Sequence, residues 1–288
     1  MTTLAWIGRR HAPRSDRKSL PMTLLAVFLA AVFILPAVWL FAGSLRPTTE
    51  IFASLSPLSW RTLIPETVSI DNYVSLFAGP FGRAFVVSLT VCLLTVALGI
   101  GVCVLAAYAL AVLSFPGRGA VFAFVVISFM VPFEAIAIPL SQLFGGWGLT
   151  NTLMGLVLPG IGNGLAVFNL RQHFLAVPGS YREAATIDGA SEIRVLGSVY
   201  LPLSGPAIVN SALLIFLGQW SAYLWPLIAV SESRLQVAPI ALAKTFAENS
   251  SNYGENFAGA IVLSLVPAVL MLILQRSFGR LSLATGEK

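Results

Sequence analysis

The polar side chains that could make specific contacts gather in two stretches of an otherwise apolar sequence. One stretch runs from residue 217 to residue 226, where Gln219 and Tyr223 stand four residues apart and would share one face of a helix. An amide can hydrogen-bond to hydroxyl groups, and the aromatic rings of Tyr223, Trp220 and Trp225 can stack on the C–H face of a sugar ring. We therefore expect these four residues to line a solute path, with an aromatic belt at the outer membrane interface as the alternative.

Two more polar residues fall inside long apolar intervals. Glu134 is the one charged residue between Arg118 and Arg171, and it follows Pro132 by two positions. A carboxylate inside a membrane is costly and usually faces a cavity or a polar partner, while a proline frees a backbone carbonyl that can line a cavity. We expect Glu134 and the similarly deep Asn163 to line the same path. The alternative for Glu134 is a hydrogen bond between helices from a protonated carboxyl.

The second polar stretch covers residues 178–206. Its opening Pro-Gly breaks the preceding helix, and Ser180 and Glu183 have the spacing of a capping box. Gly189 suits a left-handed residue at a helix end, and a second short helix must stop before Pro202. The pattern predicts two short helices joined by a glycine turn. Such a unit between two apolar segments is typical of a docking element for a cytoplasmic partner.

The composition defines the elements that must position these residues. Of the 288 residues 57% are hydrophobic and 10% are charged, and the mean hydropathy is +0.87. A soluble domain carries about 25% charged residues, so the sequence excludes a soluble globular protein. The long uncharged intervals exceed the roughly 20 residues that a membrane helix needs. We predict an all-α polytopic membrane protein with six spans, at roughly 21–44, 84–112, 120–143, 153–172, 206–230 and 256–275.

The distribution of positive charge predicts the orientation of these spans. Six spans place both termini and the segment 178–206 on one side, which carries twelve of the 17 Lys and Arg residues, against five on the other. Because Lys and Arg near span ends stay in the cytoplasm, both termini are expected there. The domain prediction is a basic cytoplasmic tail at 1–20 that contacts anionic lipid headgroups, a permease domain at 21–275 and a cytoplasmic tail at 276–288.

The segment 178–206 also carries a resemblance to a known family. Its Glu183, Ala184, Ala185, Gly189, Leu201 and Pro202 fit the pattern E-A-A-x3-G-x9-I-x-L-P, with Val199 in place of Ile. This resembles the EAA loop of ABC-importer permeases, and the string REAATIDGAS resembles the smaller permease subunit of maltose-type carbohydrate importers. The stretch 217–226 is similar to the FLGxWNxFLWPL sequence of the same family, with Ser221 and Ala222 as departures from it.

The resemblance implies a permease subunit that moves a sugar or related polyol across the cytoplasmic (inner) membrane of a prokaryote. It implies three kinds of protein partner: a second homologous permease, a dimer of cytoplasmic ABC ATPase subunits that binds ATP and Mg, and an extracellular or periplasmic solute-binding protein. Glu183 would pair with a basic group of the ATPase, the alanines would let the helix seat closely, and Gly189 would permit close backbone approach. The residues implied in ATPase coupling are Glu183, Ala184, Ala185, Asp188, Gly189, Leu201 and Pro202.

Several other functions are disfavoured by the residues themselves. The sequence has no G-x-x-x-x-G-K-[ST] and no H-E-x-x-H, and it has two histidines, so we expect no enzyme activity, no metal site and no cofactor bound by this chain. No basic stripe with interleaved aromatic residues indicates nucleic acid. A phosphorylated polyol such as glycerol phosphate is an alternative solute, but it favours basic residues that the predicted spans lack. A polytopic membrane enzyme or a channel needs a catalytic pair or a ring of like charges, which one Glu does not supply.

Overall fold

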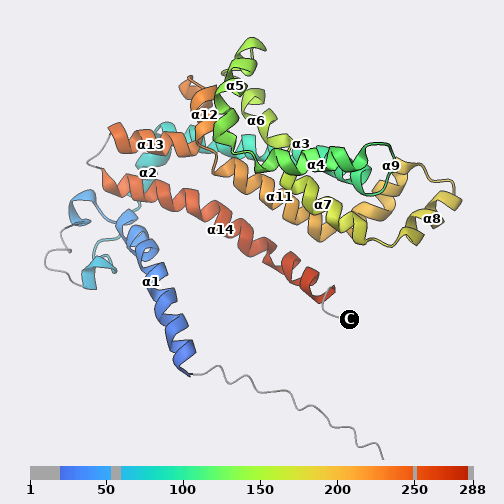
Figure 1. Cartoon of the computed structure of the whole chain (residues 1–288). Helices are drawn as coiled ribbons and strands as arrows, with labels where there is room; N and C mark the ends of the chain where they lie inside the picture. The colour runs from blue at the N-terminus through green and yellow to red at the C-terminus, as the bar shows by residue number, and fades with distance from the viewer. Residues whose placement is uncertain (1–19, 53–59, 249–251, 285–288) are drawn as a thin grey trace, which may run out of the picture.

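The computed structural model describes residues 20–52, 60–248 and 252–284, and these residues form helices and turns without a strand (Figure 1). The α-helices are α1 (Leu20–Ser44), α2 (Asp71–Ala78), α3 (Pro80–Ala111), α4 (Arg118–Met130), α5 (Phe133–Gly146), α6 (Leu153–Ile161), α7 (Gly164–Ala176), α8 (Gly179–Ile187), α9 (Glu192–Val195), α10 (Leu201–Leu203), α11 (Gly205–Trp220), α12 (Leu224–Ala229), α13 (Ala238–Glu248) and α14 (Tyr253–Ala284). Single 3-10 turns lie at Thr48–Glu50, Trp60–Thr62 and Ser233–Leu235, and a π-helical turn, η3, lies at Leu196–Tyr200.

The prediction of an all-α polytopic membrane protein is confirmed. Among the described residues, α1, α3 and α14 are long and apolar enough to cross a membrane alone, and up to six spans result if each bent helix pair counts as one. These pairs are α4 with α5, α6 with α7, and the segment 192–203 with α11, bent by 100°, 41° and 87° respectively. The count of six therefore stays a prediction. The predicted tail 1–20 falls almost wholly outside the described residues, and α14 continues past residue 275 into the predicted tail 276–288.

Three predicted spans are not continuous helices. The span predicted at 153–172 is interrupted between the end of α6 at Ile161 and the start of α7 at Gly164. The span predicted at 120–143 breaks after Met130, because Pro132 lacks an N–H donor and forces Val131 into extended geometry with φ −71° and ψ 123°. The span predicted at 206–230 ends as a helix at Trp220, and α12 begins only at Leu224. The prediction that Gln219 and Tyr223 share one face of a helix is therefore wrong, because the chain leaves helical geometry between them.

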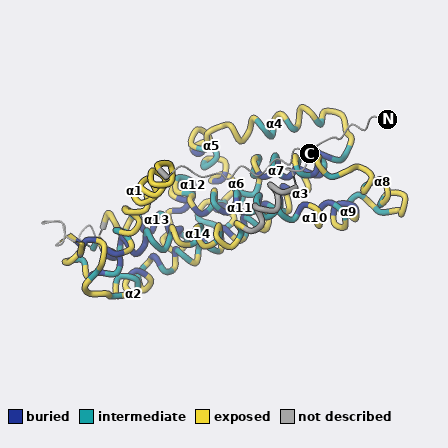
Figure 2. The backbone as a smooth tube through the Cα atoms, turned by 90° about the horizontal axis from the view of Figure 1, so that it is seen from below, coloured by how far each residue is buried: buried dark blue, intermediate teal, exposed yellow. Residues whose placement is uncertain are grey.

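Helix α3 lies at the centre of the packing. It contacts α6, α7 and α11 along its length, and its fully buried residues include Thr95 and Cys103. The contact with α6 is close, because a Cβ at Gly99 would lie 3.4 Å from the Cα and carbonyl oxygen of Ile161. By contrast, α1 packs on α14 and leaves its apolar side chains exposed over most of its length (Figures 1 and 2).

The polar segment 178–206 differs from the prediction at both helix boundaries. Helix α8 begins at Gly179 with Pro178 as its N-cap, and within the described residues no side chain caps it, so the predicted capping box of Ser180 and Glu183 is wrong. The second helix does not stop before Pro202 either. The turn η3, in which the Leu201 N–H bonds to the Leu196 carbonyl, places Pro202 at the second residue of α10, where its missing N–H costs little.

The glycine turn inside this segment is confirmed. Gly189 has φ +77°, the left-handed conformation that side chains disfavour, and it separates α8 from α9. Helices α8 and α9 lie at one end of the molecule, and α2 and α13 lie at the other (Figure 1).

Candidate functional site

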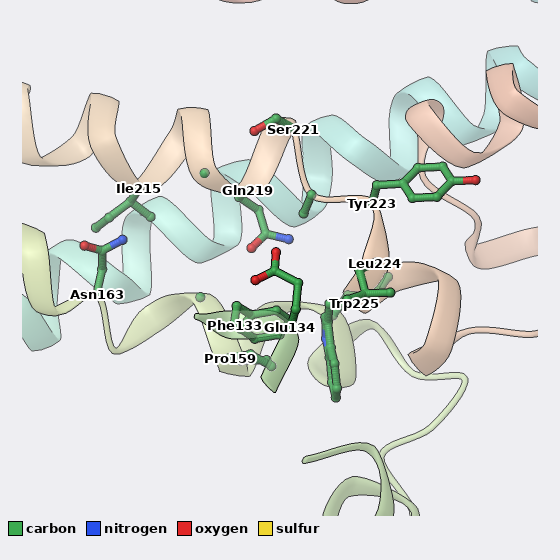
Figure 3. Close-up of a pocket in the computed structure, with 14 residues that line it drawn as sticks. Phe133, Glu134, Pro159, Asn163, Ile215, Gln219, Ser221, Tyr223, Leu224 and Trp225 are labelled. Carbon is green, nitrogen blue, oxygen red and sulfur yellow. The ribbon is translucent and has the colours of Figure 1, made fainter. Parts of the chain in front are cut away.

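A cavity of about 450 Å³ opens between α5, α6, α11 and α12. Five of the six residues predicted to line a solute path border it: Glu134, Asn163, Gln219, Tyr223 and Trp225 (Figure 3). These residues come from separate parts of the chain and meet here because three helix breaks converge. The breaks are those between α4 and α5, between α6 and α7, and between α11 and α12, and residues at or directly beside each of them contribute to the wall.

Glu134 enters the cavity from the first turn of α5, directly after the break at Pro132. The N-terminus of a helix carries a partial positive charge that favours a carboxylate. The Glu134 carboxylate and the Gln219 amide point toward one another inside the cavity (Figure 3). Among the described residues that line the cavity, Glu134 is the one with a charged side chain.

The position of Gln219 depends on a glycine that sequence reasoning did not single out. A Cβ at Gly160 would lie 2.6 Å from the Gln219 Oε1 and 2.6 Å from the Thr95 Cγ2, so the absence of a side chain there makes room for the amide. Gly160 and the preceding Pro159 both line the cavity. A Pro-Gly pair inside an apolar helix is the sequence signal that could have identified them.

Two of the predicted residues also hold the cavity wall together. The Asn163 Oδ1 accepts a hydrogen bond of 2.9 Å from the Ala166 N–H and so caps α7. The Trp225 Nε1–H donates to the Gly155 carbonyl at 2.9 Å, and its ring lies edge-on to Phe144 with centroids 5.1 Å apart. Trp225 therefore fixes α12 against α5 and α6.

Trp220 does not line this cavity. Its ring stacks on Phe216, and its Nε1–H donates a 2.9 Å hydrogen bond to the Leu263 carbonyl of α14. Successive helix residues point about 100° apart, so Trp220 faces α14 while its neighbour Gln219 faces the cavity. The structure thus separates two adjacent residues that the sequence placed together.

The second group of predicted residues lies on and after α8. None of the residues of this helix, all of which the structure describes, is buried. Glu183, Ala184 and Asp188 are exposed, and Ala185 packs against the core of α3, α7 and α11. Leu201 is half-buried against the same core and Pro202 is exposed. Large apolar side chains are exposed here too, with Ile187 at 86%, Ile193 at 80% and Tyr181 at 53%.

One polar contact at this end was not found from the sequence. The Tyr108 Oη of α3 donates a 2.5 Å hydrogen bond to the Glu192 Oε2, and the Glu192 Oε1 pairs with the Arg182 guanidinium of α8. The hydrogen bond to Glu192 raises the pKa of Arg182 above its ordinary value. Tyr108 lies in a predicted span far from the polar stretch, so spacing gave no signal of this contact.

Known proteins are similar to this chain in sequence. Residues 97–282 match the family described as binding-protein-dependent transport system inner membrane component. The chain is 34% identical over 260 residues to the arabinooligosaccharides transport system permease protein AraQ of Halalkalibacterium halodurans, covering 89% of this chain and 92% of that protein. It is 31% identical over 265 residues to the sn-glycerol-3-phosphate transport system permease protein UgpE of Rhizobium meliloti, covering 88% and 92%.

A solved structure has a similar fold. The match is to a chain in the crystal structure of a bacterial ABC transporter involved in the import of the acidic polysaccharide alginate, with a TM-score of 0.77 and 22% identity. It covers 94% of this chain and 99% of that chain.

Proposed function

The chain belongs to the family of binding-protein-dependent transport system inner membrane components, and we propose that it is the permease subunit of an ABC importer for an uncharged sugar or related polyol. It works in the cytoplasmic membrane of a prokaryote beside a second, homologous permease. A dimer of cytoplasmic ATPase subunits binds ATP and Mg, and an extracellular or periplasmic binding protein delivers the solute. This chain itself binds no cofactor.

The observation that carries the proposal is the convergence of three helix breaks on one polar cavity. Backbone that leaves helical geometry inside a membrane is tolerated where it is buried in protein or lines a water-filled cavity. Discontinuous helices form the solute sites of many transporters for the same reason. Here the breaks bring Glu134, Asn163 and Gln219 to one space of about 450 Å³, which suits a solute with several hydroxyl groups.

The charge of the cavity favours a neutral solute over glycerol phosphate. Among the described lining residues the one charged side chain is the carboxylate of Glu134, and no Lys, Arg or His joins it. A phosphate would meet repulsion from this carboxylate and would find no cationic side chain among the described residues that line the cavity. The hydroxyl groups of a sugar can instead donate to the carboxylate and accept from the Gln219 amide.

The exposed end of the molecule supports the docking of an ATPase. Helix α8 presents Tyr181 and Ile187, and α9 presents Ile193, in a segment too polar to lie in lipid. Large apolar side chains exposed next to charged ones mark a protein interface. We place this segment, with Glu183 and both termini, in the cytoplasm, where the helix seats in a cleft of the ATPase.

Co-purification tests the proposed function directly. The chain is tagged, extracted in mild detergent, and examined for an ATP-hydrolysing subunit and a second permease. We expect both to accompany it, and a panel of binding proteins loaded with neutral sugars to include one that stimulates ATP hydrolysis. A chain that purifies alone as a stable homo-oligomer would contradict the proposal and favour a channel or a membrane enzyme.

A further inference from the structure

The carboxylate of Glu192 bonds to two helices at once. Its Oε2 accepts from the Tyr108 hydroxyl of α3, and its Oε1 pairs with the guanidinium of Arg182 on α8. We propose that Glu192 is a positioning residue that locks α8 to the cytoplasmic end of α3, so that a displacement of α8 by the ATPase moves α3 with it. This inference rests on the proposed function, because it assigns a role to a contact beside the docking helix.

Helix α8 is joined to the rest of the chain by a tight turn at each end. It follows the turn at Val177-Pro178, and it ends at Gly189, whose φ of +77° marks a sharp left-handed turn. None of its residues, all of them described, is buried. Without a cross-link, a push on α8 would be absorbed as rotation about these two turns. The pair of Arg182 and Glu192 spans the Gly189 turn and opposes that rotation.

Tyr108 is a rigid anchor for the lock. It is 4% exposed, and its ring lies edge-on to Phe174 and Tyr200, with centroids 6.4 and 5.2 Å away. Aromatic rings in this arrangement fill the core and hold one another in place. The hydroxyl group therefore has a fixed position from which it donates to Glu192.

Helix α3 connects this anchor with the cavity. It is unbroken from Pro80 to Ala111, so Thr95 lies about 20 Å from Tyr108 along one rigid rod. Thr95 and Gly99 pack against Gly160 and Ile161 of α6, and Gly160 lines the cavity beside Gln219. A displacement of α3 at Tyr108 would therefore also displace the part of α6 that forms the cavity wall.

The hydroxyl group and the negative charge of the lock can be removed separately. Tyr108→Phe keeps the ring and deletes only the hydroxyl group, and Glu192→Gln keeps the shape and deletes the charge. Tyr200→Phe is a matched control, because Tyr200 belongs to the same aromatic cluster and within the described residues its hydroxyl makes no hydrogen bond.

The experiment measures the distance between α8 and α3 in the complete importer in nanodiscs. Spin labels are placed at Thr186→Cys and Leu105→Cys, both exposed, after the buried Cys92 and Cys103 are replaced by Ala. Pulsed electron paramagnetic resonance is recorded without nucleotide and with ATP trapped by vanadate. We expect a single narrow distribution of distances in both nucleotide states, for the chain with the unaltered lock and for Tyr200→Phe. Tyr108→Phe and Glu192→Gln are expected to broaden the distribution at least about twofold, because a hydrogen bond to a charged group is lost or weakened.

A charge exchange separates positioning from general damage. Arg182→Glu alone broadens the distribution, and Arg182→Glu combined with Glu192→Arg narrows it again, which a misfolded loop would not do. One outcome overturns the lock alone: a complex that still traps ATP, in which Tyr108→Phe and Glu192→Gln give distance distributions as narrow as that of the chain with the unaltered lock. A chain that brings no ATPase with it overturns both the lock and the proposed function.

Discussion

Glu134 and Gln219 face one another across the cavity, one from the first turn of α5 and the other from the last turn of α11 (Figure 3). Each stands beside a break in its helix pair. A carboxylate that accepts and an amide that both donates and accepts form a complementary set for a hydroxylated solute. We therefore propose that the selectivity of this cavity depends on the charge of Glu134 and on the placement of Gln219.

The first prediction concerns the charge of Glu134. Glu134→Gln keeps the size of the side chain, and hydrogen bonds to a charged group exceed neutral ones by about 1 kcal/mol. We expect sugar uptake to fall about fivefold to tenfold, with assembly and basal ATP hydrolysis unchanged. Uptake into proteoliposomes with the matching binding protein measures this. Ser141→Ala on the same helix is the control, since among the described residues its hydroxyl bonds to the Ile138 carbonyl of its own helix and to no other group. Undiminished uptake would exclude Glu134 from the solute path.

The second prediction concerns the room that Gly160 leaves for Gln219. Gly160→Ala would place a methyl group 2.6 Å from the Gln219 Oε1 and from Thr95. Because overpacking of this kind costs about 1–3 kcal/mol, we expect a lower Tm of the purified complex and slower uptake. Gly162→Ala is the matched control, because among the described residues no atom lies within 4 Å of a Cβ built there. Equal Tm values for the two variants would show that the amide moves aside freely.

The sequence predicted much of this cavity, because polar residues are costly to bury in a membrane. They are therefore rare in apolar intervals and can be identified there. Glu134, Asn163 and Gln219 stand out in apolar intervals, and all three border the same space. The left-handed turn at Gly189 followed from local backbone chemistry in the same way. Both inferences use properties that a few neighbouring residues determine.

The features that the sequence did not predict depend on contacts between distant segments. Pro132 predicts a disturbed helix, yet the 100° bend that follows depends on how α4 and α5 pack. Nothing near Trp220 indicates that its indole bonds to Leu263 instead of facing the cavity. The bond of Tyr108 to Glu192 joins positions 84 residues apart, which spacing alone cannot reveal.

The third prediction concerns coupling through Glu183. Glu183→Lys reverses the charge of an exposed residue of α8 and should repel the basic group expected on the ATPase. We expect the chain to insert in the membrane normally but to lose solute-stimulated ATP hydrolysis. Ser180→Ala is the control, since the described residues include no capping bond from Ser180 to α8, and it should leave hydrolysis intact. If Glu183→Lys retained full stimulation, the coupling role of this residue would be wrong.

The fourth prediction concerns the apolar side chain of Ile187. At 86% exposure it contributes little to the stability of this chain, but its burial in a partner would contribute about 1.5–3 kcal/mol. Ile187→Ser should therefore weaken association with the ATPase about tenfold or more, measured as subunit retention during dilution. Val68→Ser, which changes a 67% exposed residue near the opposite end, should not alter retention. Equal retention in both variants would place the ATPase elsewhere.

The fifth prediction separates Trp220 from its neighbour Gln219. Trp220→Phe keeps a ring beside Phe216 but loses the hydrogen bond to the Leu263 carbonyl, which costs about 0.5–1.5 kcal/mol. We expect it to lower the Tm while the relative uptake of different sugars stays the same. Gln219→Ala removes a cavity amide that makes no hydrogen bond within the described residues, so it should change the relative uptake and leave the Tm nearly unaltered. Thermal unfolding and competition uptake on the same preparations distinguish the two, and a change in sugar preference with Trp220→Phe would return that residue to the solute path.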